Sequence, residues 1–221
     1  MTTVFVTSSG TGIGKTFVTL RLLAELNAQG KRARALKPVA SGFDAEQPGG
    51  SDTALLLGAQ GLAVTPANLD AVSPFRFAAP LSPDMAAARE QRTIPFDALV
   101  ASCRAPGGFD GVTLVEGIGG VMVPLDAQHT VLDWIAALGA PTLLVVGSYL
   151  GSLSHSLTAA AALRQRGVTL LGVVVSESTE QPVPAEETAA CLERFTAPAP
   201  VRVLPRAAPV PLLPLLAPYL K

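Results

Sequence analysis

The segment from Ser8 to Thr16 constrains this chain more than any other, because its nine residues read Ser-Ser-Gly-Thr-Gly-Ile-Gly-Lys-Thr. It directly follows an apolar, β-branched run and precedes an amphipathic stretch, which is the strand–loop–helix context of a phosphate-binding loop. In such a loop, backbone N–H groups and the partial positive charge of the helix N-terminus face the phosphates. Lys15 supplies a cation for the β and γ oxygens, and the hydroxyl of Thr16 is a ligand for Mg²⁺. The sequence therefore predicts that the chain binds a nucleoside triphosphate with Mg²⁺.

A Gly-rich turn between a strand and a helix also occurs without any ligand. A lysine at the start of a helix opposes the helix dipole, however, and Lys15 therefore favours an anion at this position. One residue departs from the usual pattern, because Ser8 stands where a phosphate-binding loop of this spacing normally carries glycine.

Short apolar runs alternate with amphipathic stretches along the chain, a pattern typical of βαβ units. Six runs are almost continuously apolar, as expected for parallel strands that helices cover on both sides. These predicted strands are Val4–Thr7, Ala33–Lys37, Val112–Glu116, Thr142–Gly147, Leu170–Ser176 and Val201–Leu204. We expect an α/β fold with a doubly wound, mostly parallel sheet and helices on both faces. The length of 221 residues, with 49% apolar and 15% charged residues, predicts a single domain over residues 1–221.

Two segments are predicted to be long helices, Thr16–Gln29 and Ser152–Arg166, because each is followed by a glycine that can end a helix. Ser82–Glu90 and Phe96–Arg104 are predicted to be shorter helices. Ser41–Gly50 combines Gly and Pro with polar residues and is predicted to be a mobile loop. The apolar tail Pro209–Leu220 contains four prolines and is expected to pack along the domain surface.

Charge and cysteine usage argue against several classes of partner. The formal net charge is −1 and Lys and Arg are scattered singly, so no basic stripe is present to neutralise nucleic-acid or lipid phosphates. The apolar tail has about 12 residues, far fewer than the ~20 needed to cross a bilayer. Cys103 and Cys191 lack metal-ligand spacing, and the N-terminus lacks a signal-peptide pattern. We expect a cytoplasmic protein without nucleic-acid or membrane partners.

Glu116 ends a predicted strand, and the carboxyl ends of parallel strands face the ligand crevice of an open sheet. A phosphate-binding loop needs a neighbouring carboxylate for the Mg²⁺ shell, and Glu116 is the natural candidate. An ordinary strand-end carboxylate in solvent is the alternative. Gly117, Gly119 and Gly120 follow it and would permit the close approach of a substrate.

Lys37 comes at the end of the second predicted strand, so its ammonium is expected in the same crevice as Lys15. The alternative is a purely structural lysine whose side chain extends into solvent. Asp52 is a second candidate for the Mg²⁺ shell, but an acid before a helical stretch can also be an N-cap. Ser51 and Thr53 are rival caps for the same helix.

Five ordered motifs carry a resemblance to a known enzyme family. They are GTGIGKT at residues 10–16, KPVASG at 37–42, the Ser51-Asp52 pair, VEGIGG at 115–120 and LGSLSH at 150–155. Together they closely resemble the dethiobiotin synthetases of the biotin pathway, and the similarity runs from the first strand to about residue 205. The resemblance implies an ATP-dependent ligase that closes a cyclic urea from 7,8-diaminononanoate and CO₂, through a carbamic-phosphoric anhydride, with release of ADP and phosphate. It also implies Mg²⁺ as cofactor and a homodimer.

The same resemblance implies roles for individual residues. Lys37, Lys15 and Thr11 are implied to be catalytic, with Lys37 contacting the carbamate and the γ-phosphate. The implied metal ligands are Thr16, Asp52 and Glu116. The implied nucleotide-binding residues are Gly12, Ile13, Gly14, Lys15, Thr16, Phe17, Asp52, Glu116, Gly119, Ser176, Leu204, Pro205 and Arg206. The implied substrate-binding residues are Ser41, Lys37, Gly117, Ile118, Gly151, Ser152, Leu153 and Ser154, the last four through N–H groups that reach the substrate carboxylate across the dimer interface.

Three positions depart from the pattern of the family. Gly12 stands where the family often has an acidic residue, and Tyr149 stands where it has a basic or polar one. At Ser176-Glu177 the family commonly has Asn followed by Asp, which read adenine. A hydroxyl replaces the donor and acceptor pair of an amide, so discrimination between bases is expected to be relaxed. Leu204-Pro205-Arg206 is expected to form a second wall for the base.

The remaining residues of interest are predicted to have structural roles. His155 follows a helix start, where a single histidine is more often a hydrogen-bonded structural residue than a proton shuttle. His129 has no partner pattern, and Trp134 is predicted to lie in the core.

Three other functions are compatible with a phosphate-binding loop on this fold. A partition or septum-placement ATPase would carry an additional lysine near the loop's start, where this chain has Ser9 and Gly10. A small-molecule kinase would transfer the phosphate to its product, whereas cyclisation releases free phosphate. An amidating enzyme of the same fold would need an added glutaminase region, for which no length remains.

Overall fold

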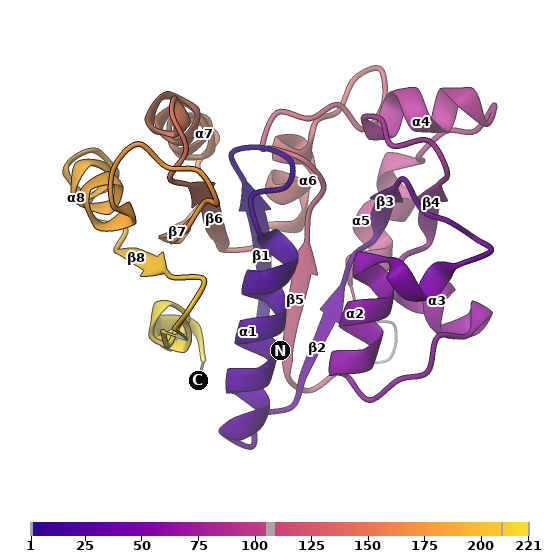
Figure 1. Ribbon diagram of the computed structural model, residues 1–221. Helices are drawn as coiled ribbons and strands as arrows, with labels where there is room; N and C mark the ends of the chain where they lie inside the picture. The colour runs from indigo at the N-terminus through magenta and orange to yellow at the C-terminus, as the bar shows by residue number, and fades with distance from the viewer. Residues whose placement is uncertain (1, 105–108, 209, 221) are drawn as a thin grey trace.

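A six-stranded sheet forms the centre of the computed structural model, which describes residues 2–104, 109–208 and 210–220. Every neighbouring pair of strands is parallel, and the strand order is β2-β5-β1-β6-β7-β8 (Figure 1). The six strands confirm the predicted fold class and lie within a residue or two of the predicted segments. Their bounds are β1 Thr2–Ser8, β2 Ala33–Leu36, β5 Val112–Glu116, β6 Thr142–Gly147, β7 Leu170–Ser176 and β8 Val201–Leu204.

Helices cover both faces of this sheet. Alternate side chains of β1 point to opposite faces, so Phe5 belongs to one buried cluster while Val4 and Val6 belong to another. The Phe5 face packs against α5 (Phe96–Cys103), α6 (Val131–Leu138), α7 (Ser152–Gln165) and α8 (Ala185–Thr196). The Val4 face packs against α1 (Lys15–Ala28), which lies in front of the sheet in Figure 1. Both predicted long helices, α1 and α7, are therefore confirmed.

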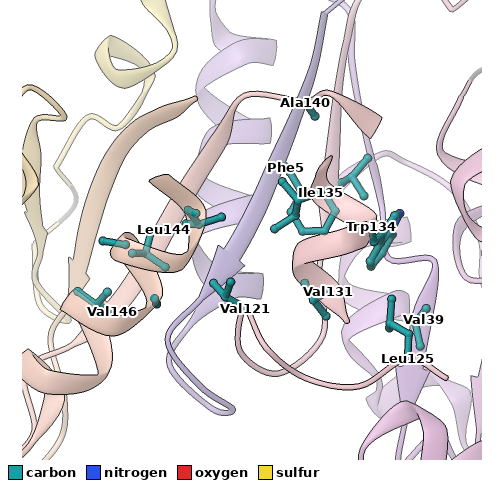
Figure 2. Close-up of a cluster of buried hydrophobic side chains, with 14 of the residues drawn as sticks. Phe5, Val39, Val121, Leu125, Val131, Trp134, Ile135, Ala140, Leu144 and Val146 are labelled. Atoms are coloured by element: carbon teal, nitrogen blue, oxygen red, sulfur yellow. The ribbon is translucent and has the colours of Figure 1, made fainter. Parts of the chain in front are cut away.

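The core on the Phe5 face is organised around Trp134. Its indole ring is fully buried and meets the ring of Phe5 edge to face, with 4.8 Å between the centroids. Figure 2 shows Trp134 and Ile135 of α6 beside Phe5. The prediction that Trp134 is a core residue is confirmed.

The residues between β2 and β5 in the sequence form a smaller lobe. It contains a parallel two-stranded sheet, β3 (Val39–Ser41) with β4 (Phe75–Phe77), that the sequence did not reveal. The predicted shorter helices are present as α4 (Pro83–Arg89) and α5. The predicted loop at 41–50 is irregular except for the end of β3 and a short 3₁₀ helix, η1; its mobility stays a prediction. The other elements are η1 Pro48–Gly50, α2 Asp52–Ala59 and α3 Pro66–Val72.

The C-terminal tail packs against α1, as predicted, although Pro209 lies outside the described residues. Its two 3₁₀ helices are η2 (Leu213–Leu215) and η3 (Ala217–Tyr219). The Glu25 carboxylate of α1 accepts hydrogen bonds from the backbone N–H groups of Leu212 and Leu213, at 2.9 and 2.8 Å. None of the described helices is both long and apolar enough to cross a membrane.

Candidate active site

The loop between β1 and α1 forms a turn at the carboxyl edge of the sheet (Figure 1) that depends on glycine. Gly14 is the residue that precedes α1 and has φ +104°, in the left-handed region that glycine adopts without strain. A Cβ at Gly14 would lie 2.7 Å from the Ser176 hydroxyl at the end of β7. The loop therefore brings its backbone against the end of a strand two places along the sheet.

Lys15 is a buried cation with only neutral partners. Its Nζ donates to Ser8 Oγ at 3.1 Å, to the Gly119 carbonyl at 3.0 Å and to the Gly10 carbonyl at 3.3 Å. The side chain is only 7% exposed, and burial, together with repulsion from Lys37, lowers the pKa of Lys15 to about 8 although Glu116 and Asp52 partly offset this.

Ser8, the unusual first residue of the loop, takes part in the same contact. Its hydroxyl donates to the Gly119 carbonyl at 2.9 Å while it accepts the bond from Lys15 Nζ. The hydroxyl thus links the loop to the glycine-rich segment after β5. This is a contact that a glycine at the first position could not make.

Lys37 lies between two carboxylates. Its Nζ is 2.5 Å from Asp52 Oδ2 and 2.6 Å from Glu116 Oε1. Lys37 follows β2 and Glu116 ends β5, and the two strands are hydrogen-bonded neighbours, so the fold brings these side chains together. Lys37 is 6% exposed and Glu116 is 0% exposed. Lys37 therefore does not extend into solvent, and Glu116 is not an ordinary solvent-exposed carboxylate; the catalytic role of Lys37 stays a prediction.

The charges in this cluster shift each other's pKa. Burial would lower the pKa of Lys37, but Glu116 and Asp52 outweigh it, so the pKa of Lys37 is raised. Burial would raise the pKa of Asp52, but the charge and hydrogen bonds of Lys37 and a hydrogen bond from Thr16 hold it below its usual value. Asp52 is not the N-cap of α2, because Ser51 Oγ accepts the capping bond from the Ala54 N–H, and the role of Asp52 as a metal ligand stays a prediction.

The residues around Glu116 fit a Mg²⁺ ion. Thr16 Oγ1 donates to Glu116 Oε1 at 2.7 Å, while Glu116 Oε2 is buried and has no hydrogen-bond partner in the part of the chain that the structure describes. Hydroxyl and carboxylate oxygens are the ligands that Mg²⁺ prefers, and it usually takes one or two carboxylates together with phosphates. Across residues 2–104, 109–208 and 210–220 there is no group of three or more His, Cys, Asp or Glu that could hold a metal by itself. This arrangement suits a metal that arrives with phosphate oxygens.

Two cavities meet at the Gly-rich loop. The smaller, of ≈ 490 Å³, contains both lysines and is lined by Thr11, Gly12, Gly14, Lys15, Thr16, Lys37, Ala40, Ser41, Gly42, Phe43, Gly50, Ser51, Asp52, Thr53, Ile118 and Gly119. The larger, of ≈ 1020 Å³, extends along the ends of β6, β7 and β8 and is lined by Ser9, Gly10, Thr11, Gly12, Ile13, Gly14, Phe17, Tyr149, His155, Ser176, Glu177, Ser178, Thr179, Glu180, Leu204 and Arg206. The loop residues from Thr11 to Gly14 face both, apart from Ile13, which lines only the larger one.

Comparisons with known proteins agree with this geometry. The family model described as "AAA domain" matches residues 2–219. The ATP-dependent dethiobiotin synthetase of Methylobacterium nodulans is 51% identical over 213 residues, which cover 92% of this chain and 92% of the relative. The enzyme of the same name from Acidiphilium cryptum is 51% identical over 86% of each chain. The chain belongs to the ATP-dependent dethiobiotin synthetase family.

Among solved structures, the septum site-determining protein MinD of Pyrococcus horikoshii, in complex with Mg-ADP, aligns with a TM-score of 0.54 and 18% identity. The alignment covers 92% of this chain and 81% of MinD. McdA of Cyanthece aligns with a TM-score of 0.53 and 13% identity, over 94% of this chain and 86% of McdA. Identities this low show a shared fold, and MinD and McdA therefore resemble this chain in fold alone.

Most of the residues implied by the dethiobiotin synthetase pattern line one cavity or the other, but several do not. Glu116 contributes through its hydrogen bonds without lining either cavity. Gly117 packs against the core, since a Cβ there would lie 2.8 Å from the Phe5 ring. The other predicted residues outside both cavities of the single chain are Pro205, Gly151, Ser152, Leu153 and Ser154. Their roles stay predictions.

The sequence did not assign Tyr149, His155 or Phe43 to the site, although all three line one of the cavities. Tyr149 Oη lies 2.9 Å from His155 Nδ1, and the pair forms part of the larger cavity. The position of Tyr149 just after β6 was a usable signal, because strand ends face the crevice. Phe43 lines the smaller cavity, but its hydrophobic neighbours in the smaller lobe come from distant segments, and no local pattern indicated this.

Both carboxylate oxygens of Glu177, the residue after Ser176, accept hydrogen bonds at the wall of the larger cavity. Glu177 Oε2 accepts the backbone N–H of Arg206 at 2.8 Å, and Glu177 Oε1 accepts Gln181 Nε2 at 3.2 Å. The Glu177 N–H donates in turn to the Leu204 carbonyl at 3.1 Å. Glu177 Oε2 and the Glu177 N–H thus join the end of β7 to the end of β8 and the residues after it, while Oε1 stays within the loop after β7. Leu204 and Arg206 line the larger cavity, and their role as a wall for the base stays a prediction.

Proposed function

We propose that this chain uses ATP to close the cyclic urea of dethiobiotin from 7,8-diaminononanoate and CO₂, releasing ADP and phosphate. Family membership supports the reaction class, which is that of a carbon–nitrogen ligase. The observation that carries the assignment to this site is the position of two buried lysines in one cavity beside the Gly-rich loop.

The proposed reaction involves no covalent intermediate with the enzyme. Catalysis therefore depends mainly on stabilising the negative charge that develops on the phosphoryl group. One amine of the substrate takes up CO₂ and loses a proton to give a carbamate, whose oxygen attacks the γ-phosphorus as ADP leaves. The second amine then attacks the carbonyl carbon and displaces phosphate. Negative charge develops on the phosphoryl group at each transfer, so preorganised cations lower the barrier. We infer that Lys15 and Lys37 supply them and that Thr11 and Ser41 orient substrate and phosphate, which their common position along the smaller cavity supports.

The two cavities suggest a division of the ligands. The larger cavity runs from the loop to Ser176 and Leu204, which suits the nucleoside, and the smaller one suits the γ-phosphate and the diamine. Thr16, Asp52 and Glu116 would hold Mg²⁺, as the partnerless Glu116 Oε2 supports. When bound, the ion would neutralise part of the phosphate charge.

We propose further that the substrate site is completed by a second copy of the chain. Gly151–Ser154, the implied carboxylate site at the start of α7, lie outside both cavities of the single chain. Leu150 beside them is 84% exposed. Mixing two inactive variants, Lys37→Ala and Ser154→Glu, should restore part of the activity, because a mixed dimer would contain one intact site. No recovery in a preparation shown by native mass spectrometry to contain mixed dimers would contradict a shared site.

The decisive experiment follows phosphate release from Mg-ATP and bicarbonate, with and without 7,8-diaminononanoate, and identifies the product by mass. Release that requires the diamine and yields dethiobiotin supports the proposal. A phosphorylated diamine would instead indicate a kinase, and hydrolysis that ignores the diamine would indicate an ATPase switch.

A further inference from the structure

The strongest unassigned feature of the molecule is the position of the Lys37 ammonium. It lies 2.5 Å from Asp52 Oδ2 and 2.6 Å from Glu116 Oε1, so it bridges the two carboxylates proposed above as metal ligands. The third proposed ligand, Thr16 Oγ1, donates to the same Glu116 oxygen at 2.7 Å. One ammonium therefore lies between two of the three side chains proposed to hold Mg²⁺, on the same Glu116 oxygen that Thr16 contacts.

We propose that Lys37 acts as an internal cation that fills the metal site of the nucleotide-free protein. On this view the metal site becomes available only when phosphate oxygens draw the Lys37 ammonium away from Asp52 and Glu116. The inference rests on the proposed function for the identity of the metal ligands, and it adds a second role for Lys37 before any chemistry begins.

Electrostatics explain why the site would need an internal cation. Glu116 is fully buried, and a buried carboxylate without a compensating charge is strongly unfavourable. The Lys37 ammonium compensates the negative charge of Glu116. It also pairs with the carboxylate of Asp52, whose side chain is 49% exposed. While the ammonium is in place, a divalent cation at the same oxygens would meet a like charge at close range. The ammonium therefore both stabilises the empty site and opposes metal binding there.

The surroundings allow the side chain to move while its backbone stays fixed. The Lys37 N–H donates to the Val72 carbonyl at 3.0 Å, which anchors the main chain to α3. The side chain lines the ≈ 490 Å³ cavity, into which four methylenes can swing. Lys15 has no such role, because its hydrogen bonds go to Ser8, Gly10 and Gly119 and to neither carboxylate.

Metal binding to the nucleotide-free protein tests the proposal directly. Mn²⁺ serves as the probe, since its free concentration is read by electron paramagnetic resonance, and no nucleotide or diamine is added. Lys37→Met should tighten Mn²⁺ binding by about tenfold or more, because the competing charge is gone while the oxygen ligands remain. Lys37→Arg keeps the charge and should bind Mn²⁺ as weakly as the unmodified protein. Lys31→Met, at the other end of β2, is the matched control and should leave binding unchanged.

A second measurement covers the case in which Lys37→Met folds poorly. Millimolar Mg²⁺ should raise the melting temperature of Lys37→Met and of Lys37→Gln, and should leave that of the unmodified protein almost unchanged. Adding Asp52→Asn to either variant should abolish this rise. Equal Mn²⁺ affinities in the Met and Arg variants, or an equal Mg²⁺-dependent rise in the unmodified protein, would overturn the proposal. Because neither readout involves turnover, these results are independent of whether the chain makes dethiobiotin.

Discussion

Replacing Lys15 with methionine is expected to remove a pH-dependent penalty from the nucleotide-free protein. Burial lowers the pKa of Lys15 from 10.5 to about 8. A difference of about 2.5 pKa units corresponds to about 3 kcal/mol between the charged and neutral forms. Below pH 8 the lysine is charged in both the folded and the unfolded state, so the folded protein bears the whole penalty. As pH rises through 8, the folded state releases a proton that the unfolded state keeps up to about pH 10.5, and the penalty falls.

Urea unfolding of the two proteins without nucleotide measures this effect. Between about pH 7 and about pH 9.5, the free energy of unfolding of the unmodified protein should rise by about 2 kcal/mol relative to Lys15→Met. Taking the difference between the two proteins cancels the titration of groups that they share. Lys31→Met serves as the control and should follow the unmodified protein across the whole range.

Two results would refute this reasoning. If the difference between the two proteins stayed constant over the pH range, the Lys15 ammonium would not be held in a desolvated site. If the difference changed in the opposite direction, a carboxylate would be its main partner, as for Lys37. Saturating Mg-ADP should also weaken the pH dependence, because phosphate oxygens favour the charged form of Lys15.

Three further substitutions test other parts of the site and fold. Lys37→Ala should abolish formation of the cyclic urea while the calorimetric Kd for ATP changes by less than about threefold; lost nucleotide binding with turnover preserved at saturation would show that the role is misassigned. Glu116→Gln should raise the Mg²⁺ concentration for half-maximal activity by roughly tenfold, and an unchanged requirement would remove this side chain from the metal shell. Glu25→Ala should lower the free energy of unfolding by about 1–3 kcal/mol, because the N–H groups of Leu212 and Leu213 lose their acceptor; a tail still fully protected from proteolysis in this variant would argue against that contact.

The sequence predicted the central sheet because its strands are almost continuously apolar. Such runs have few alternatives to a strand covered on both faces, and the structure places all six of them in the parallel sheet. The short strands β3 and β4 carry no comparable signal, since each has three residues and Val39 pairs with Phe75, far away in sequence. Strands this short are stabilised by tertiary contacts, which a local pattern does not contain.

The members of the site were predictable, but their pairing was not. The Gly-rich loop and the strand-end rule pointed to Lys15, Lys37 and Glu116 from their positions alone. The ion pair of Lys37 with Asp52 and Glu116 joins residues separated by 15 and 79 positions. Only the strand order β2-β5-β1 brings those segments together, and the sequence predicted the strands without their order.

Lys15 and Lys37 differ in their hydrogen-bonding partners and in the direction of their pKa shifts, which predicts a different role in ligand binding for each. Lys37 is matched by two carboxylates, and its pKa is raised, so it has little to gain from an additional anion while they remain its partners. Lys15 is surrounded by two carbonyls and a hydroxyl, and its pKa is lowered, so a phosphate would relieve an existing penalty. We therefore expect binding of a triphosphate to be driven first by Lys15 and the loop amides. Under the proposal above, phosphate oxygens of the bound nucleotide then draw the Lys37 ammonium away and the metal takes its place between Asp52 and Glu116, so one exchange couples the release of Lys37 to the arrival of the metal with the nucleotide.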